Sequence, residues 1–425
     1  MPSRIQISIS ILGALNISEL QNFDPFVFLN SNKPNGKNLL ALGAKKDTSH
    51  FDEGDQLGQL QNLHITDSDW LFGFMTYDLK NQLEVLKSEN KPSFNLPILY
   101  FFQPKVVIEW CNESGIIHFY QEDYSEAEIR LLVSQLFKTQ NNRVESVPEV
   151  TFHSNISKEA YLNQVEFLLN ELRYGNIYEV NFCQQFQAIE TTFDPFQGYV
   201  ELNKISPVPF SAFLRKKDFF ALCASPERYL SHKNGRMISQ PIKGTIKRDP
   251  DVLVDAQLIS DLQHSKKDKK ENVMIVDLVR NDLSRTAKKG SVQVDELFGV
   301  HTYPQVHHLV STISSELKPN LHPIEAIKTS FPMGSMTGAP KVSAMELIEQ
   351  TENFKRQLYS GSIGYIKPNS DFDFNVVIRS LFFDHQTKQL SFAVGGAITS
   401  DSIPEKEYEE SMLKAKAIFQ MFGKT

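Results

Sequence analysis

Residues 98–120 have the sequence ILYFFQPKVVIEWCNESGIIHFY, in which two runs of β-branched and aromatic residues are separated by a turn-forming segment at Asn112–Gly115. Residues of these types favour strands, and a short polar turn between two such runs is typical of a hairpin. Just upstream, WLFGFMTYD (residues 70–78) has the same character. This half of the chain is therefore predicted to be rich in strands.

Further along the chain, helical and strand patterns alternate. After Ser157, apolar residues recur at helical spacing until Gly175, which predicts an amphipathic helix with a glycine stop. A long, mostly helical segment is expected over residues 251–289. Strands are expected at residues 177–186, 218–225, 361–366, 375–383 and 391–399, and a closing helix at 403–422.

The composition is that of a globular protein. The 425 residues are 41% hydrophobic and 22% charged, with a net charge of -7, so there is no polycationic region for nucleic acid or for an anionic membrane surface. Cys111, Cys183 and Cys223 are too far apart for a zinc ribbon or a disulfide framework. No apolar stretch reaches about 18 residues, and the N-terminal run is broken by polar residues, so a soluble protein of the cytoplasm is expected.

A polar segment at residues 139–157 has no periodicity and contains Pro148, which is typical of a linker or surface connection. It suggests a soft division into an N-terminal region (1–150) and a larger core (151–425).

The stretch QPIKGTIKR (residues 240–248) contains a lysine with a defined direction. Pro241 favours extended backbone before Lys243, while Gly244 permits a tight turn and Thr245 adds a hydroxyl. Glu227 follows a predicted strand in SPERY and could point into a cleft. The simpler interpretations are a surface loop for Lys243 and a solvated turn for Glu227.

Two acidic helix patches lie far apart in the sequence. Glu271 ends the charge run 266–271, whereas Glu407, Glu410 and Lys414 are spaced three and four residues apart on one helical face. Solvated faces with ordinary ion pairs would explain both patches. Carboxylates from two helices would also suit Mg²⁺, which prefers oxygen ligands. Between the patches, a Gly-rich turn at 331–340 enters a helix whose start would suit an anion such as a carboxylate, although it is not a Walker A loop.

A set of ordered motifs resembles the chorismate-utilising enzymes, the family that includes anthranilate, aminodeoxychorismate, isochorismate and salicylate synthases. The motifs are GNIYEVNF from Gly175, SPERY from Ser225, PIKGTIKR from Pro241, ENVMIVDLVRNDLSR from Glu271, HLVS from His308, GSMTGAPK from Gly334, YSGSIGY from Tyr359, VVIRS from Val376, and VGGAITSDS with EYEE between Val394 and Glu410. The N-terminal GFMTYD and FFQP resemble the family's first region.

The resemblance implies a large α+β fold in which antiparallel sheets pack together with helices outside, and a site for chorismate and Mg²⁺. By similarity, Glu271 and Glu410 would hold Mg²⁺, with Asp268 and Glu407 nearby. Asp268 departs from the glutamate of many relatives. The expected substrate contacts are Arg379, Tyr359, Lys414, Gly395 and Gly396 for a carboxylate and the enolpyruvyl arm, and His308 and Thr337 around the ring. Thr245 is also expected to contact the substrate.

Lys243 separates the branches of this family. C2-directed members usually carry alanine there, whereas aminodeoxychorismate synthases carry PIKGT, with a lysine that adds at C2, expels the C4 hydroxyl and is then replaced by ammonia at C4. Glu227 would be the general acid or base. Attack requires a neutral amine, so we expect the pKa of Lys243 to be lowered.

Glu179 holds the position of the water-activating lysine of isochorismate and salicylate synthases, which disfavours water addition at C2, and it departs from the glutamine common in amine-transferring members. The alternatives are anthranilate synthase component I and a non-catalytic chorismate-binding regulatory partner.

No G-x-C-x-G elbow surrounds any of the three cysteines, so ammonia is expected from a separate glutamine amidotransferase subunit. Release of para-aminobenzoate, for folate synthesis, is expected to need a separate pyridoxal-phosphate lyase.

Overall fold

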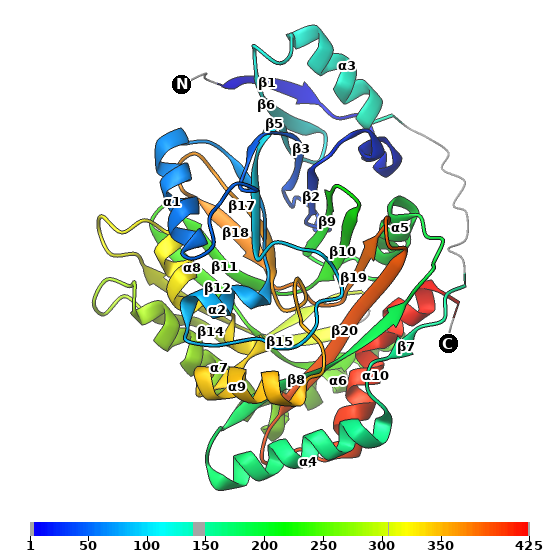
Figure 1. Ribbon diagram of the computed structural model, residues 1–425, viewed down its shortest axis with the longest axis vertical. Helices are drawn as coiled ribbons and strands as arrows, with labels where there is room; N and C mark the ends of the chain where they lie inside the picture. Colours follow the sequence, from blue (N-terminus) through cyan, green and yellow to red (C-terminus); the bar gives the residue numbers. More distant parts are fainter. Residues whose placement is uncertain (1–3, 139–148, 305, 424–425) are drawn as a thin grey trace.

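The computed structural model describes residues 4–138, 149–304 and 306–423. Strands occupy the middle of the molecule and helices lie around them, with α4, α9 and α10 at one end and α1 and α8 along one side (Figure 1). The strand pairs within these ranges are antiparallel, so the α+β class with antiparallel sheets and outer helices is confirmed.

The strands are β1 (Arg4–Ser10), β2 (Phe26–Asn30), β3 (Asn38–Asp47), β4 (Leu71–Met75), β5 (Leu99–Cys111), β6 (Ser114–Tyr120), β7 (His153–Ser154), β8 (Glu179–Ala188), β9 (Phe210–Lys216), β10 (Phe219–Ser225), β11 (Arg228–Lys233), β12 (Arg236–Gln240), β13 (Ile242–Lys247), β14 (Gln293–Thr302), β15 (Val306–Glu316), β16 (Gly338–Ala339), β17 (Ser362–Ile366), β18 (Phe372–Asn375), β19 (Ser380–Asp384) and β20 (Gln389–Ile398). The helices are α1 (Gln56–Asp67), α2 (Lys80–Leu83), α3 (Glu126–Leu136), α4 (Lys158–Tyr174), α5 (Pro195–Ile205), α6 (Val252–His264), α7 (Lys266–Ser284), α8 (Ile324–Ser330), α9 (Lys341–Thr351) and α10 (Pro404–Met421), with short 3-10 turns η1 (Ile17–Asn22), η2 (Tyr77–Leu79) and η3 (Gly334–Met336).

The predicted hairpin is β5–β6, and its long strand joins two sheets. The C-terminal part of β5 pairs with β6, while its first residues, Leu99–Phe102, pair with β4. The first sheet continues from β5 through β3, β2, β9, β10, β19, β20 and β8. The second runs from β4 through β17, β18, β11, β12 and β15, with β13 and β14 also paired to β15. Each sheet therefore contains strands from both halves of the chain.

The chain crosses between these sheets at two functional candidates. Glu227 lies between β10 of the first sheet and β11 of the second, and Arg379 lies in the return from β18 to β19. The two crossings touch, because the backbone N–H of Val376 donates to the carbonyl of Glu227 at 3.1 Å. Arg379 has φ +52°, a left-handed conformation that is uncommon for a residue other than glycine. The junction of the sheets thus brings Glu227 and Arg379 into one region.

The helix predicted after Ser157 was confirmed, and capping residues mark both of its ends. Helix α4 begins after Ser157, whose hydroxyl accepts from the backbone N–H of Ala160, and it ends at Gly175, with φ +81°. One prediction was wrong in part: the expected strand over 375–383 is divided between β18 and β19, because the chain changes sheets there. The expected helical segment over 251–289 is confirmed as two helices, α6 and α7, that meet at Ser265.

The segment 240–248 is a strand rather than a turn. Residues Ile242–Lys247 form β13 beside β15, and the register shifts between Ile242 and Thr245. Gly244 has φ +97°, so it supplies the irregularity that glycine accommodates most easily. Lys243 therefore projects from a paired strand, which holds its direction more firmly than a loop would.

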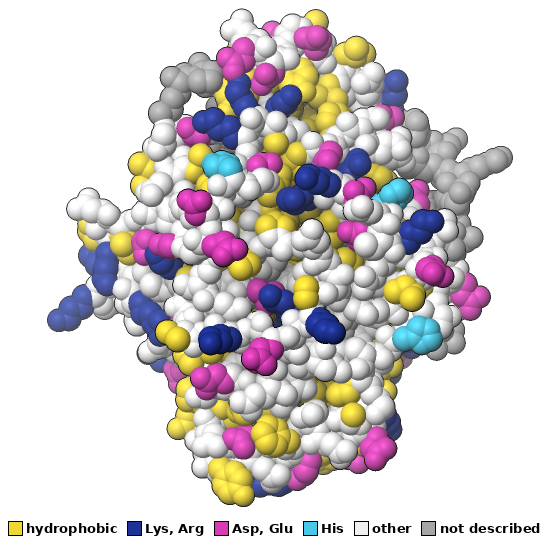
Figure 2. Space-filling view, viewed as in Figure 1, with side chains coloured by type: hydrophobic (Ala, Val, Ile, Leu, Met, Phe, Trp, Pro, Cys, Tyr) yellow, Lys and Arg dark blue, Asp and Glu magenta, His cyan; other side chains and the backbone are white. Residues whose placement is uncertain are grey.

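Most of the expected linker, residues 139–148, lies outside the described residues, and the division near residue 150 stays a prediction. Across the described ranges, no helix is long and apolar enough to cross a membrane. Figure 2 shows basic and acidic side chains interspersed over one face, in keeping with the modest net charge of -7.

Candidate active site

Lys243 lies at the centre of the candidate site. Its side chain is 9% exposed, and its Nζ donates to Glu179 Oε1 on β8 at 2.6 Å. Burial lowers the pKa of Lys243, but the negative charges of Glu179, Glu271 and Glu227 outweigh burial and the pKa is raised. The expected lowering was wrong, because the negative charges of three carboxylates favour the ammonium form. The resting lysine is a buried cation.

Glu227 is the second catalytic candidate, and it is 4% exposed. Its Oε1 accepts a hydrogen bond from the hydroxyl of Ser335 at 2.7 Å. Burial raises the pKa of Glu227 to about 7, although Ser335 and the charges of Lys243 and Arg379 oppose this shift. A carboxyl group with this pKa exchanges protons near neutral pH, as a general acid must. Ser335 was missed from the sequence, although it lies in the Gly-rich motif.

The predicted metal ligands lie on two helices, and Lys267 pairs with one acid of each helix. Glu271 and Asp268 lie on α7, and Glu407 and Glu410 lie on α10. A Cβ added to Gly396 of β20 would lie 3.6 Å from Glu407 Oε2 and 3.7 Å from Glu410 Oε1. The absence of a side chain at Gly396 thus leaves room beside both carboxylates. Asp268 is packed against Gly244, where an added Cβ would lie 3.2 Å from its Oδ1.

The donor atoms suit a hard divalent cation in kind. Glu271 Oε1 and Glu407 Oε2 are buried and have no hydrogen-bond partner within the described part of the chain. Burial raises the pKa of Glu271 to about 7, against the attraction of Lys243 and Lys267. Such oxygens gain strongly from a nearby positive charge. In the described ranges no three His, Cys, Asp or Glu side chains gather closely enough to hold an ion together. Lys267 pairs with Glu271 and Glu407.

His308 and Thr245 form one pair of predicted substrate contacts. Thr245 Oγ1 and His308 Nδ1 are 2.7 Å apart on neighbouring strands, and His308 is fully buried. Burial, together with the charge of Arg379, lowers the pKa of His308 well below its ordinary value, so the imidazole is neutral. Its Nε2 has no hydrogen-bond partner among the described residues. A neutral ring with an unpartnered buried nitrogen is suited to a polar ligand group.

Lys414 and Gly395 form a second pair. Lys414 Nζ donates to the carbonyl of Gly395 at 2.9 Å and pairs with Glu410 at 2.8 Å. The charge of Lys414 is the main cause that lowers the pKa of Glu410. A side chain at Gly395 would collide with the backbone of Phe182, so only glycine fits this close strand pairing. The ammonium group of Lys414 is therefore held at the edge of the acidic group, the name used below for Asp268, Glu271, Glu407 and Glu410.

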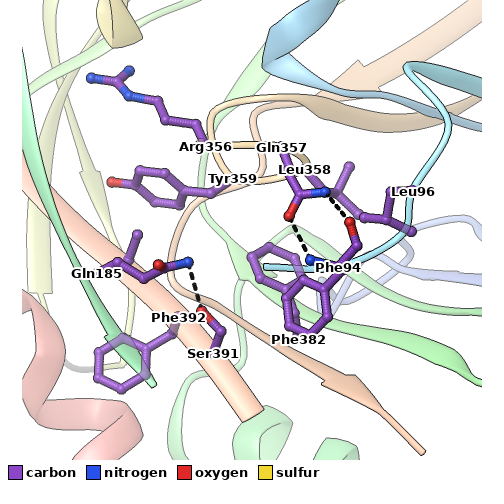
Figure 3. Close-up of a pocket in the computed structure, with 11 residues that line it drawn as sticks. Phe94, Leu96, Gln185, Arg356, Gln357, Leu358, Tyr359, Phe382, Ser391 and Phe392 are labelled. Atoms are coloured by element: carbon purple, nitrogen blue, oxygen red, sulfur yellow. Dashed lines mark hydrogen bonds between the residues drawn. The ribbon is translucent and has the colours of Figure 1, made fainter. Parts of the chain in front are cut away.

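Tyr359 and Thr337 have other partners. Tyr359 is buried, and its hydroxyl lies 3.6 Å from the thiol sulfur of Cys183. It borders a cavity of about 10 Å³, shown in Figure 3, which is too small for anything larger than water. The hydroxyl of Thr337 donates to the carbonyls of Met333 and Gly334 in its own turn. These bonds leave the predicted substrate contacts of both residues without direct support.

A larger cavity of about 670 Å³ opens beside the acidic group. It is lined by Lys267 and Glu271 of α7, by Tyr178 before β8, and by Asp401 after β20, among others. This volume is in the range of small-molecule sites. Of the predicted metal ligands, Glu271 lines this cavity.

The fold and this site define a chorismate-binding enzyme. Residues 25–420 match the family model for chorismate binding enzymes, and the chain belongs to that family. It is 37% identical over 349 residues to aminodeoxychorismate synthase component 1 of Salmonella typhimurium, covering 81% of this chain and 75% of that protein. It is 41% identical over 273 residues to the Escherichia coli protein of the same name, covering 64% of this chain and 60% of that protein. The crystal structure of anthranilate synthase component I from Streptococcus pneumoniae superposes with a TM-score of 0.77 at 26% identity, covering 99% of this chain and 93% of that one.

Proposed function

We propose that this chain converts chorismate and ammonia to 4-amino-4-deoxychorismate. The observation that carries the proposal is Lys243, which is buried on a strand within the electrostatic reach of Glu227, Glu179 and Glu271. The similarity to proteins named aminodeoxychorismate synthase component 1 supports the same reaction. A separate lyase would then release para-aminobenzoate for folate synthesis.

The reaction begins with a proton transfer from Lys243. Since its ammonium group cannot attack, a nearby base must take a proton, and Glu179 Oε1 lies 2.6 Å away. The neutral amine then forms a C–N bond at C2 of chorismate, both conjugated ring double bonds shift by one position, and the C4–O bond breaks. Protonated Glu227 gives its proton to the departing hydroxyl, which leaves as water.

Ammonia completes the exchange. It forms a C–N bond at C4 while both conjugated double bonds shift back and the bond between C2 and Lys243 breaks. The amine of Lys243 is regenerated, and the proton lost by the incoming ammonia is taken up by the carboxylate of Glu227. Two displacements at the same allylic system leave the configuration at C4 unchanged overall.

Mg²⁺ is part of the proposal. Glu271 and Glu410 would hold it, with Glu407 and Asp268 nearby, and it would neutralise a substrate carboxylate and strengthen the electrostatic field at the reacting ring. The unpartnered oxygens of Glu271 and Glu407 support this assignment. Lys414, Arg379 and His308 would bind and orient the rest of the ligand.

Ammonia would come from a separate glutamine amidotransferase subunit. A glutaminase of the usual type needs a reactive thiolate, but burial raises the pKa of Cys183 to about 12 and of Cys223 to about 11. Neither buried thiol suits that role. All three cysteines are free, which also supports the proposed location in the reducing cytoplasm.

One incubation separates this function from its alternatives. Chorismate, ammonium salt and Mg²⁺ are mixed with the chain, and the products are followed by chromatography, mass and fluorescence. We expect 4-amino-4-deoxychorismate. Anthranilate fluorescence without an added lyase would indicate an anthranilate synthase instead, and no consumption of chorismate, even with an amidotransferase present, would indicate a non-catalytic partner.

A further inference from the structure

Lys267 is a cation in the middle of the acidic group. It lies in the first turn of α7, and its Nζ is 3.2 Å from Glu407 Oε1 and 3.9 Å from Glu271 Oε1. The two partners come from different helices. Glu407 has a side chain only 2% exposed, whereas that of Lys267 is 44% exposed. An exposed lysine therefore reaches inward to neutralise a buried carboxylate.

Burial and mutual repulsion disfavour the ionised forms of these carboxylates. Glu271 and Glu407 each keep one buried oxygen without a hydrogen-bond partner within the described ranges, and Glu410 lies close to Glu407 around Gly396. Buried like charges raise each other's free energy unless a cation compensates them. Lys267 is the cation that pairs with an acid of each helix, Glu271 on α7 and Glu407 on α10, while Lys243 and Lys414 attract Glu271 and Glu410.

The side chain of Lys267 has space to move away from Glu407 and Glu271. Lys267 lines the cavity of about 670 Å³ together with Glu271 and Asp401. A flexible four-carbon side chain that is already partly in water can turn into this cavity by changing rotamers, without moving α7. Its neighbour Lys270 lines the same cavity but pairs with Asp401 at 3.2 Å and with none of the three glutamates.

We propose that Lys267 is an internal counter-cation that exchanges with Mg²⁺. In the metal-free protein its ammonium group neutralises Glu407 and Glu271, and it turns out into the cavity when the metal binds. This inference rests on the magnesium site of the proposed function. The exchange keeps the acidic group assembled before the metal arrives, and it weakens metal affinity because the lysine must be displaced.

The test is calorimetric titration of MgCl₂ alone into the full chain, without chorismate. We expect Lys267→Met to bind Mg²⁺ about tenfold more tightly than the parent, since a competing unit charge is removed at close range. Lys270→Met removes one positive charge from the same cavity. It should bind Mg²⁺ within about twofold of the parent, because solvent screens the charge of Lys270 from the glutamates. Thermal unfolding gives a second measure: the melting temperature of Lys267→Met should rise more steeply with MgCl₂ than that of the parent.

The outcomes distinguish this inference from the proposed function. Tighter binding by Lys267→Met, including binding where the parent shows none, supports the exchange. Equal or weaker binding by Lys267→Met, with clear binding by the parent, overturns the exchange and leaves the magnesium site intact. No binding by either protein overturns both. Equal tightening by Lys270→Met would reduce the effect to general charge and also overturn the exchange.

Discussion

Replacing Ser335 by alanine should move the basic limb of the pH profile to higher pH. In the parent, the hydroxyl of Ser335 donates to Glu227 Oε1 at 2.7 Å, which stabilises the ionised carboxylate. A hydrogen bond to a charged group contributes about 1.5 kcal/mol or more, and one pKa unit corresponds to about 1.4 kcal/mol. The pKa of Glu227, raised to about 7 by burial, should therefore rise by roughly one further unit in Ser335→Ala.

The assay is the pH dependence of kcat/KM for 4-amino-4-deoxychorismate formation. Glu227 gives a proton to the leaving hydroxyl, so the rate should fall as pH rises through its pKa, near 7 in the parent and roughly one unit higher in Ser335→Ala. Ser330→Ala is a matched control, because Ser330 is also buried but bonds to Tyr229 and Ala326. A basic limb that stays in place or moves to lower pH would refute the reasoning.

Stability provides an independent check of the same group. The folded-state pKa of Glu227 lies above its ordinary value of 4.5, so the folded protein holds this proton more tightly and loses stability as pH rises from 4.5 to about 7. In Ser335→Ala this loss should continue to about one unit higher. Urea unfolding at a series of pH values measures it without any substrate.

Three further substitutions test the rest of the site. Lys243→Ala should abolish the covalent adduct detected by mass and lower product formation at least about 100-fold. Lys247 is exposed on the same strand, and Lys247→Ala should change neither the adduct nor product formation. Parent-level activity of Lys243→Ala would contradict the covalent role. Glu179→Gln keeps a hydrogen-bond acceptor but removes a charge that raises the pKa of Lys243, so the acid limb of adduct formation should move to lower pH. An unchanged limb argues against the pair. Gly396→Ala places a methyl group 3.6 to 3.7 Å from the two carboxylates of α10, and it should weaken chorismate binding about tenfold without changing the melting temperature; binding equal to the parent would exclude this position from the site.

Much of the local structure could be predicted because its causes are local. The β5–β6 hairpin follows from strand-forming runs around a polar turn, and α4 begins and ends at its own capping residues. The errors lie where tertiary packing overrides local preference. The sequence around Lys243 suggests a turn, but pairing with β15 makes it a strand, and the change of sheet at Arg379 divides an otherwise strand-like run.

The chemical identity of the site was present in the sequence, since the ordered motifs and Lys243 predicted the family and the amine-transferring branch. The contacts that control protonation were not. Glu179 and Lys243 are 64 positions apart, Ser335 and Glu227 are 108 apart, and Lys267 and Glu407 are 140 apart. Residue types and spacing determine which groups can donate, accept or carry charge. Only the packing of two sheets and their helices determines which of these groups are in contact and buried from water. That contact and burial shift their pKa values.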